Sequence, residues 1–418
     1  MRWRLRALSV LGAGLRMPSG ARGRALQDGL SGTGGTAPAP DRHRPSPGRG
    51  RGDTVRAWTE LFRVSALFSV PGDALAGAAA VGRSPGRGTA LAIGASLCLY
   101  EAGMALNDWA DREEDAVDRP HRPIPSGRIS PPAALGAAGV LTAAGLALAA
   151  RAGRPALAVA TGLAATVWAY DLHLKHTKAG PAAMAAARTL DLLLGATASV
   201  AAGARGGVAA RGSAPVVPGA ADNVAAPAHP ARGPLTALPA ALVLGAHTYG
   251  VTAVSRHEAQ GGSTALPLAA LATTAGLGAA VLTAGRADRT RPPEPGAGGV
   301  GATGPGEHRT TRPYRFTPAD LLLTAFTPTD LLLTTFTPAD LLLTAFTGAY
   351  LRTAGPPLLH AALNPSPPLT QRAVGGGIRA MIPLQAALAT RAGAPGSGLA
   401  VMALVPLARS LARKVSPT

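Results

Sequence analysis

Apolar residues occur along this chain in long runs that are nearly free of charged side chains. Seven runs occupy the first two thirds of the sequence, at residues 61–82, 89–106, 133–150, 155–170, 182–203, 234–254 and 264–285. Three shorter runs follow at residues 339–351, 374–390 and 397–409. An α-helix needs about 20 apolar residues to cross a bilayer. The pattern therefore predicts an all-α, multi-pass membrane protein.

Polar segments of biased composition separate these runs. The Arg-rich N-terminus predicts a disordered cytoplasmic tail, or a translation start placed too far upstream. A Gly-, Pro- and Arg-rich linker and a threefold ten-residue repeat interrupt the second half, and the repeat unit is too short for a solenoid. The Thr-Pro-x-Asp of each copy is typical of a helix start, and the last copy is expected to continue into a membrane segment through Tyr350. We divide the chain into tail, membrane core in two parts, linker and repeat: residues 1–53, 54–285 with 348–418, 286–315 and 316–347.

The net charge and the aromatic content together limit the kinds of partner that the chain is expected to bind. Lys and Arg number 40 against 22 Asp and Glu, a formal charge of +18, yet aromatic residues make up 4% of the chain. So few aromatic side chains offer no stacking platform for bases, and we expect no nucleic-acid binding. The single cysteine, Cys98, excludes an intrachain disulfide and a cysteine-based metal site.

Acidic residues gather at the end of the second apolar run. Asp108, Asp111 and Asp115 are spaced i, i+3 and i+7, which places three carboxylates on one face if this segment is helical. Divalent cations relieve the repulsion between such carboxylates, and Mg²⁺ is commonly held by one or two of them together with substrate phosphates. Arg119 and Arg122 follow, and guanidinium groups bind phosphate oxygens. The segment predicts a metal and diphosphate site; the alternative is a solvated acidic helix end.

The motif Asn-Asp-x-x-Asp-x-x-x-Asp, followed by Arg-Pro-x-x-Arg-Pro-Ile-Pro-Ser-Gly from Arg119, resembles the first aspartate-rich motif of the UbiA superfamily of intramembrane prenyltransferases. The resemblance covers roughly Trp58 to Gly285 and extends to the C-terminal helices. It implies a bundle of about nine membrane helices around a central cavity open to lipid. It also implies that four residues of the motif bind Mg²⁺ and an allylic prenyl diphosphate: Asn107, Asp108, Asp111 and Asp115.

Two later segments extend this comparison. Tyr170 to Lys175 resembles the Tyr…Lys loop of the superfamily, in which the lysine contacts the diphosphate, although Lys175 could also be a basic flank that only sets orientation. Where the superfamily carries a second aspartate-rich motif, this chain has Ser255 to Gly262, and Glu258 keeps the carboxylate there. The resemblance therefore makes Glu258 the candidate for further metal binding in this loop.

Ionisable residues inside apolar runs are rare enough to indicate function. Arg188 and Asp191 lie one turn apart in one run, where Arg188 either contacts the diphosphate or pairs with Asp191. Asp73 follows Pro71-Gly72, a pair expected to open the first helix and to turn Asp73 towards a cavity. There Asp73 either orients the acceptor or takes its proton, or it only hydrogen-bonds a neighbouring helix.

These features predict Mg²⁺-dependent transfer of a prenyl group from an isoprenyl diphosphate to a small acceptor, whether aromatic, quinone precursor or polar, within the lipid bilayer. The alternatives are a catalytically silent family member and a polytopic transporter. We expect a multi-pass protein of the cell membrane. If the basic tail stays inside, the loops at 107–132, 171–181 and 255–263 face the cytoplasm.

Overall fold

The computed structural model describes residues 51–212, 233–258, 261–287 and 337–415. These residues are almost entirely helical and contain no strand, which confirms the predicted all-α class. The longer helices are α2 (Val70–Ala80), α3 (Arg87–Ala110), α5 (Pro131–Ala152), α6 (Arg154–Ala169), α7 (Gly180–Gly212), α8 (Leu238–Ser255), α9 (Ala265–Ala287), α11 (Pro338–Leu363), α12 (Pro367–Arg391) and α13 (Pro395–Val415). Shorter elements are α1 (Arg51–Leu61), η1 (Val64–Ser69), α4 (Arg112–Asp118), η2 (Tyr170–Leu174) and η3 (Pro234–Ala237). The predicted tail before Arg51, most of the linker and the first two repeat copies lie outside the described residues.

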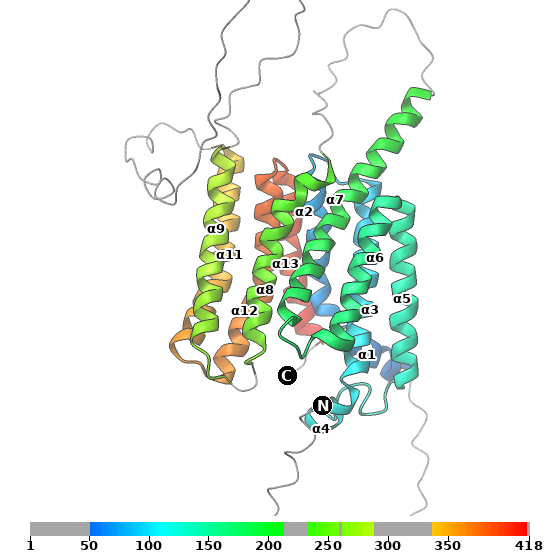
Figure 1. Cartoon of the computed structure of the whole chain (residues 1–418), viewed down its shortest axis with the longest axis vertical. Coiled ribbons are helices and arrows are strands. Elements are labelled where there is room, and N and C mark those ends of the chain that lie inside the picture. Colours follow the sequence, from blue (N-terminus) through cyan, green and yellow to red (C-terminus); the bar gives the residue numbers. More distant parts are fainter. Residues whose placement is uncertain (1–50, 213–232, 259–260, 288–336, 416–418) are drawn as a thin grey trace, which may run out of the picture. The chain divides into compact units, whose positions relative to one another are not determined.

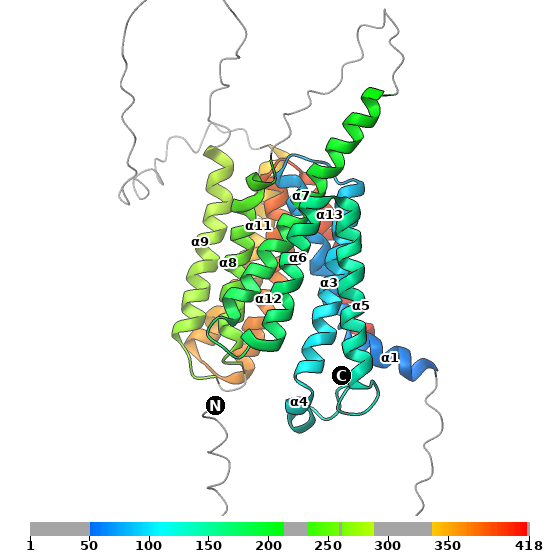
Figure 2. The same cartoon turned by 45° about the vertical axis from the view of Figure 1, so that its right-hand side comes forward.

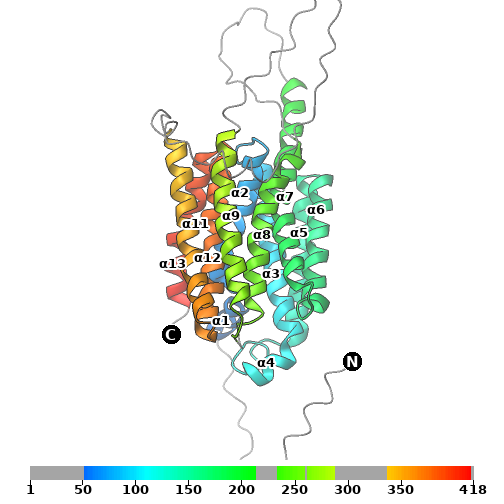
Figure 3. The same ribbon diagram turned by 60° about the vertical axis from the view of Figure 1, so that its left-hand side comes forward.

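The longer helices run side by side as a bundle (Figure 1, Figure 2 and Figure 3). α7 packs against α2, α3, α6 and α8, while α12 packs against α2, α8, α11 and α13. One apolar core, which includes Leu99, Leu163 and Leu194, joins α3, α6 and α7. A second core, which includes Leu244 and Leu384, joins α8 and α12 with their neighbours. The N-terminal and C-terminal parts of the predicted core therefore form one packed unit.

Small residues allow the central helices to approach closely. A Cβ atom added to Gly195 of α7 would lie 2.4 Å from the Cα atom of Ala74, and one added to Gly77 would lie 2.2 Å from the Leu192 carbonyl oxygen. These distances are too short for any side chain, so α2 and α7 touch through their backbones. Helices in membranes commonly associate in this way, because lipid provides no hydrophobic drive between them. The abundance of Gly and Ala in the apolar runs thus has a packing reason.

The outer surface of the bundle suits a membrane. Within the described part of the chain, five helices are long and apolar enough to cross a bilayer. Large apolar side chains lie exposed on several helices: Val140, Leu242, Leu268, Leu359, Ile378 and Leu399. Lipid tails are as apolar as these side chains, so their exposure within a bilayer carries no hydrophobic penalty.

The first apolar run differs from its predicted form. Residues 61–82 do not make one helix, because η1 ends at Ser69 and α2 begins at Val70 with Pro71 in its first turn. Proline is favourable in a first turn, since the N–H that it lacks has no helical partner there. Pro71 therefore lies in the first turn of α2, and the prediction that it opens a longer helix from within is wrong. The predicted segments 339–351 and 374–390 are likewise parts of longer helices, α11 and α12.

The helix start predicted in the last repeat copy is confirmed. The Thr337 hydroxyl accepts a hydrogen bond from the backbone N–H of Asp340 at 3.3 Å, and the Asp340 carboxylate accepts one from the backbone N–H of Thr337 at 3.1 Å. This reciprocal cap starts α11. The helix continues through Tyr350, whose hydroxyl lies 3.0 Å from Nδ1 of His247 in the bundle core. The last copy of the repeat therefore leads into the packed core.

Candidate functional site

Four connections meet at one end of the bundle, and three of them carry the predicted site residues. The four connections are residues 111–130, 170–179, 256–264 and 364–366, and the first three carry the predicted residues. The Arg256 guanidinium donates a hydrogen bond to the Thr177 carbonyl oxygen, which joins the second connection to the third. The backbone N–H of Gly262 donates to the Pro365 carbonyl oxygen at 2.8 Å, which joins the third to the fourth. Segments far apart in sequence thus form one polar surface.

The three aspartates of the first motif do not share a single helical face. α3 ends at Ala110 and α4 begins at Arg112, so Asp111 lies at the junction. Asp108 and Asp115 turn to the same side, where Nη1 of Arg122 lies 3.4 Å from Oδ1 of Asp108 and 2.6 Å from Oδ2 of Asp115. Both carboxylates are almost completely buried. Arg122 therefore holds the two outer aspartates of the motif together.

Asp111 points to a different partner. Its carboxylate forms an ion pair with the Lys175 ammonium, which comes from the connection between α6 and α7. A ligand atom from each of Asp111, Glu114 and His176 lies within 4.8 Å of the others, a spacing that could hold a metal ion. The same three residues line an open cavity of about 330 Å³ with Trp109. Asp111 is thus the most open of the three aspartates, with 19% of its side chain exposed.

A second contact ties the first motif to the Tyr170 segment. The Asn107 side-chain amide donates a hydrogen bond of 3.0 Å to the carboxylate of Asp171. Asp171 lies in the short π-helical turn that begins at Tyr170, and the backbone N–H of Lys175 donates to the Tyr170 carbonyl oxygen at 2.9 Å. This widened turn directs Asp171 and Lys175 to α3. π-Helical turns of this kind occur frequently at functional sites.

Arg63 joins this cluster, although the sequence provided no signal for it. Its guanidinium lies 3.0 Å from Oδ1 of Asp108. The residue connects α1 to η1 in the left-handed region, with φ of 45° and ψ of 49°, which is unfavourable for a residue with a side chain. Backbone strain of about 1–3 kcal/mol is tolerated chiefly at sites where function requires it. Arg63 is the third residue of the predicted run 61–82, and a basic residue so close to the end of a run resembles an ordinary membrane flank.

The cluster is formally balanced in charge, with four carboxylates and four cations. These are Asp108, Asp111, Asp115 and Asp171 with Arg63, Arg119, Arg122 and Lys175. Arg119 belongs to it through Asp115, at 3.4 Å. A divalent cation can compete with the basic groups for the carboxylates, and those basic groups are then free to bind an anion. The site is therefore suited to bind a cation and a polyanion together.

Glu258 lies on the third connection. Burial raises the pKa of the Glu258 carboxyl, and the positive charge of Arg119 offsets part of that rise. Arg119 is thus the member of the cluster whose charge acts on Glu258. Among the described residues, Glu258 takes no part in the ion pairs that Asp108, Asp111 and Asp115 form.

Asp73 and Arg188 lie apart from the acidic cluster, deep in the bundle. The Arg188 guanidinium donates to Oδ2 of Asp73 and lies 4.0 Å from Oδ2 of Asp191. Ser96 of α3 donates to Asp191, and Ser96 precedes Asp108 by 12 residues, about 18 Å along the helix. Arg188 and Asp191 therefore form the internal ion pair that was one of the two predicted alternatives. The structure brings Arg188 to Asp73 and not to the first motif.

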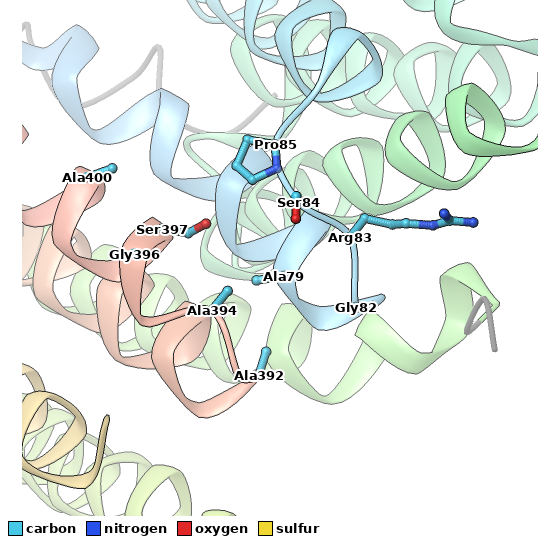
Figure 4. Close-up of a pocket in the computed structure, with 11 residues that line it drawn as sticks. Ala79, Gly82, Arg83, Ser84, Pro85, Ala392, Ala394, Gly396, Ser397 and Ala400 are labelled. Atoms are coloured by element: carbon cyan, nitrogen blue, oxygen red, sulfur yellow. The ribbon is translucent and has the colours of Figure 1, made fainter. Parts of the chain in front are cut away.

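A different cavity lies at the opposite end of the bundle (Figure 4). It measures about 590 Å³ and lies between the turn from α2 to α3 and the turn from α12 to α13. Ala and Gly make up most of its lining, together with Ser84, Ser397 and Arg83. In Figure 4 the Arg83 side chain extends away from Ser397. The concentration of carboxylates and cations at the other end makes that end the candidate site.

Comparison with known proteins gives a family match over about half of the chain. Residues 66–285 match the UbiA prenyltransferase family, a range that includes every member of the cluster except Arg63. Digeranylgeranylglyceryl phosphate synthase of Methanopyrus kandleri is 38% identical over 128 residues, which is 29% of this chain and 45% of that protein. The Methanothrix thermoacetophila protein of the same name is 62% identical over 45 residues, 11% of this chain and 17% of that protein. The chain thus matches less than half the length of these curated relatives.

Matching solved structures are more distant in sequence. An apo UbiA homolog from Aeropyrum pernix K1 has a TM-score of 0.47 at 14% identity, with 81% of this chain and 98% of that chain covered. A UbiA homolog from Archaeoglobus fulgidus, solved with GPP and Mg²⁺ bound, has a TM-score of 0.43 at 16% identity, with 83% and 99% covered.

Proposed function

The chain belongs to the UbiA prenyltransferase family, and we propose that it transfers a prenyl group from an allylic isoprenyl diphosphate to a small acceptor within the membrane. The observation that carries this proposal is the charge-balanced cluster at the end of α3, where Asp108, Asp111 and Asp115 meet Arg122 and Lys175. Carboxylates alone would repel a diphosphate, and cations alone would need no metal. The mixture suits a diphosphate that arrives with Mg²⁺.

The donor set fits Mg²⁺. The three aspartates offer hard oxygen ligands, and the larger exposure of Asp111 leaves it accessible to an arriving ion. We assign metal binding to Asp108, Asp111 and Asp115, with Glu258 as a further carboxylate near Arg119. When bound, Mg²⁺ would neutralise the negative charge that develops on the leaving diphosphate.

The basic side chains of the cluster bind the diphosphate directly in this proposal. Arg122, Arg119 and Lys175 each exchange an aspartate for phosphate oxygens, while Tyr170 and Asn107 shape the turn and the helix end that hold them. These donors are strongest where charge appears as the C–O bond breaks. The allylic carbocation that results is then attacked at C1 by the acceptor. The surrounding Ala- and Leu-rich helices exclude the water that would otherwise quench the cation.

Asp73 and Arg188 support the site from a distance in this proposal. Asp73 has no exposed surface and its carboxylate already accepts hydrogen bonds from Arg188 and Gln385, so it has no free oxygen for a substrate. The pair fixes α2 to α7. We further propose a multi-pass protein of the cell membrane whose site connections face the cytoplasm, with the basic N-terminal tail on the same side.

Release of diphosphate tests the proposed function. Membranes containing the protein would receive Mg²⁺ and, in turn, dimethylallyl, geranyl and geranylgeranyl diphosphate, with cell extract as the source of acceptor. We expect Mg²⁺-dependent release that Asp111→Asn abolishes and that Asp118→Asn, which removes an exposed carboxylate of α4, leaves unchanged. Folded protein that binds a donor without releasing diphosphate would instead indicate a silent family member. Movement of an intact donor across the membrane would indicate a transporter.

A further inference from the structure

One acidic side chain inside the bundle has no partner. Both carboxyl oxygens of Glu101, in the second half of α3, are buried and neither has a hydrogen-bond partner among the described residues. Two further acids inside the bundle are satisfied, since Asp73 bonds Arg188 and Gln385 and Asp191 bonds Ser96. A buried polar group without a partner typically costs about 1–3 kcal/mol. Glu101 therefore destabilises the fold unless a bound molecule donates a hydrogen bond to it.

α3 carries both Glu101 and Asp108 of the proposed diphosphate site, so this helix fixes the distance between them. It precedes Asp108 by seven residues, which is two turns, so the two residues lie on the same side of α3. The separation along the axis is about 10 Å. A donor whose diphosphate binds at Asp108 and Asp111 and whose tail enters the bundle would place its first carbons at about this depth. Glu101 is thus near the place where the new bond forms.

We propose that Glu101 binds the hydroxyl or amino group of the acceptor and takes its proton during prenyl transfer. This inference rests on the proposed function. The bond between C1 of the prenyl group and the diphosphate oxygen breaks, and both electrons leave with the oxygen. A lone pair on the acceptor oxygen or nitrogen forms the bond to C1, and the proton from that atom passes to the Glu101 carboxylate. The products are the prenylated acceptor, diphosphate and a protonated Glu101, which later returns its proton to water.

The hydrogen-bonding capacity of Glu101 defines the class of acceptor. To take a proton, the Glu101 carboxyl must be in its carboxylate form, which only accepts hydrogen bonds, so its partner in this step must be a donor. Alcohols and amines provide an O–H or N–H on the atom that attacks, whereas a ring carbon of an aromatic acceptor does not. The acceptor therefore attacks through the oxygen of a hydroxyl group or the nitrogen of an amine, and its product is a prenyl ether or a prenyl amine.

Labelling with N,N′-dicyclohexylcarbodiimide, an apolar reagent that modifies carboxyl groups within membranes, tests the position of Glu101 without any acceptor. Peptide mass spectrometry would follow adducts on Glu101, Asp73 and Asp191 in the full chain, with and without geranyl diphosphate and Mg²⁺. We expect Glu101 to be labelled in preference to the two paired aspartates, and bound geranyl diphosphate to reduce that labelling at least fivefold. Labelling that the donor leaves unchanged, or no labelling of Glu101, would overturn the proposal.

The role in proton transfer is tested with Glu101→Gln, which keeps the size of the side chain and removes the proton acceptor. We expect formation of prenylated product from cell extract to fall about 100- to 10,000-fold, while geranyl diphosphate affinity and the melting temperature stay unchanged. Asp118→Asn is the matched control. A wild-type protein that releases no diphosphate from any donor would contradict the proposed function itself. Full transfer by Glu101→Gln, or a product prenylated on an aromatic carbon, would overturn the role of Glu101 alone.

Discussion

The side chains of Gln385 and Asp73 are 312 residues apart in sequence, yet the Gln385 amide donates a hydrogen bond of 2.6 Å to Oδ1 of Asp73. The same amide nitrogen donates to the Ser69 carbonyl oxygen at 2.7 Å, at the junction of η1 and α2. Gly72 makes room for it, because a Cβ atom there would lie 2.1 Å from Oε1 of Gln385. The C-terminal part of the chain is thereby bonded to the helix break that precedes Asp73.

Replacing Gln385 by Leu should destabilise the protein. The substitution keeps much of the volume but leaves Asp73 and the Ser69 carbonyl oxygen without this donor, and the loss is expected to be about 2–4 kcal/mol. Thermal unfolding in detergent would measure it. Gln371→Leu is the control, because Gln371 is exposed on the same helix, α12. Equal melting temperatures for the two variants would show that the Gln385 hydrogen bonds contribute nothing to stability.

Arg122→Gln should weaken binding of the prenyl diphosphate. Arg122 contacts both Asp108 and Asp115 in the free protein and is placed to exchange them for phosphate oxygens. A hydrogen bond to a charged group is worth about 1.5–3 kcal/mol, so the Kd for geranyl diphosphate should rise about 10- to 100-fold. Equilibrium binding with a labelled donor would measure the change.

The control for Arg122 is Arg154→Gln. Arg154 starts α6 at the opposite end of the bundle and is exposed, so its loss should not change donor binding. If both variants bind the donor as tightly as the wild type, Arg122 serves only to hold Asp108 and Asp115 in place.

Lys175→Met should strengthen metal binding and weaken binding of the prenyl diphosphate. The Lys175 ammonium pairs with Asp111 in the free protein, so it competes with any cation for that carboxylate. Without donor, removal of this charge should tighten binding of Mn²⁺, used as a spectroscopic substitute for Mg²⁺, by about fivefold, which corresponds to roughly 1 kcal/mol. The KM for geranyl diphosphate should rise, because a phosphate partner is lost.

Lys178→Met provides the comparison for Lys175, since Lys178 is exposed on the same connection. It should leave both Mn²⁺ affinity and KM unchanged. An unaltered Mn²⁺ affinity in Lys175→Met would mean that Asp111 does not bind the metal ion.

The sequence was sufficient to predict the class of fold and to propose the acidic site. Apolar runs of membrane length need no tertiary information, because the bilayer imposes the helix on each run separately. The cluster from Asp108 to Asp115 and the following Arg119 and Arg122 is also local, so its spacing alone indicated metal and diphosphate binding. The capping box at Thr337 and Asp340 is local in the same sense, and it was predicted correctly.

Only the tertiary structure decided which distant side chains meet. Arg63 and Asp108 are 45 residues apart, and Gln385 and Asp73 are 312 residues apart. Neither contact has a periodic signal in the sequence. The sequence presented Asp73, Arg188 and Asp191 alike, as ionisable residues in apolar runs, and Glu101 lies in such a run as well. Packing of α2 against α7 supplied partners for the first two and none among the described residues for Glu101. Burial and hydrogen bonding depend on every neighbouring helix, and this is why a linear pattern locates such residues without assigning their roles.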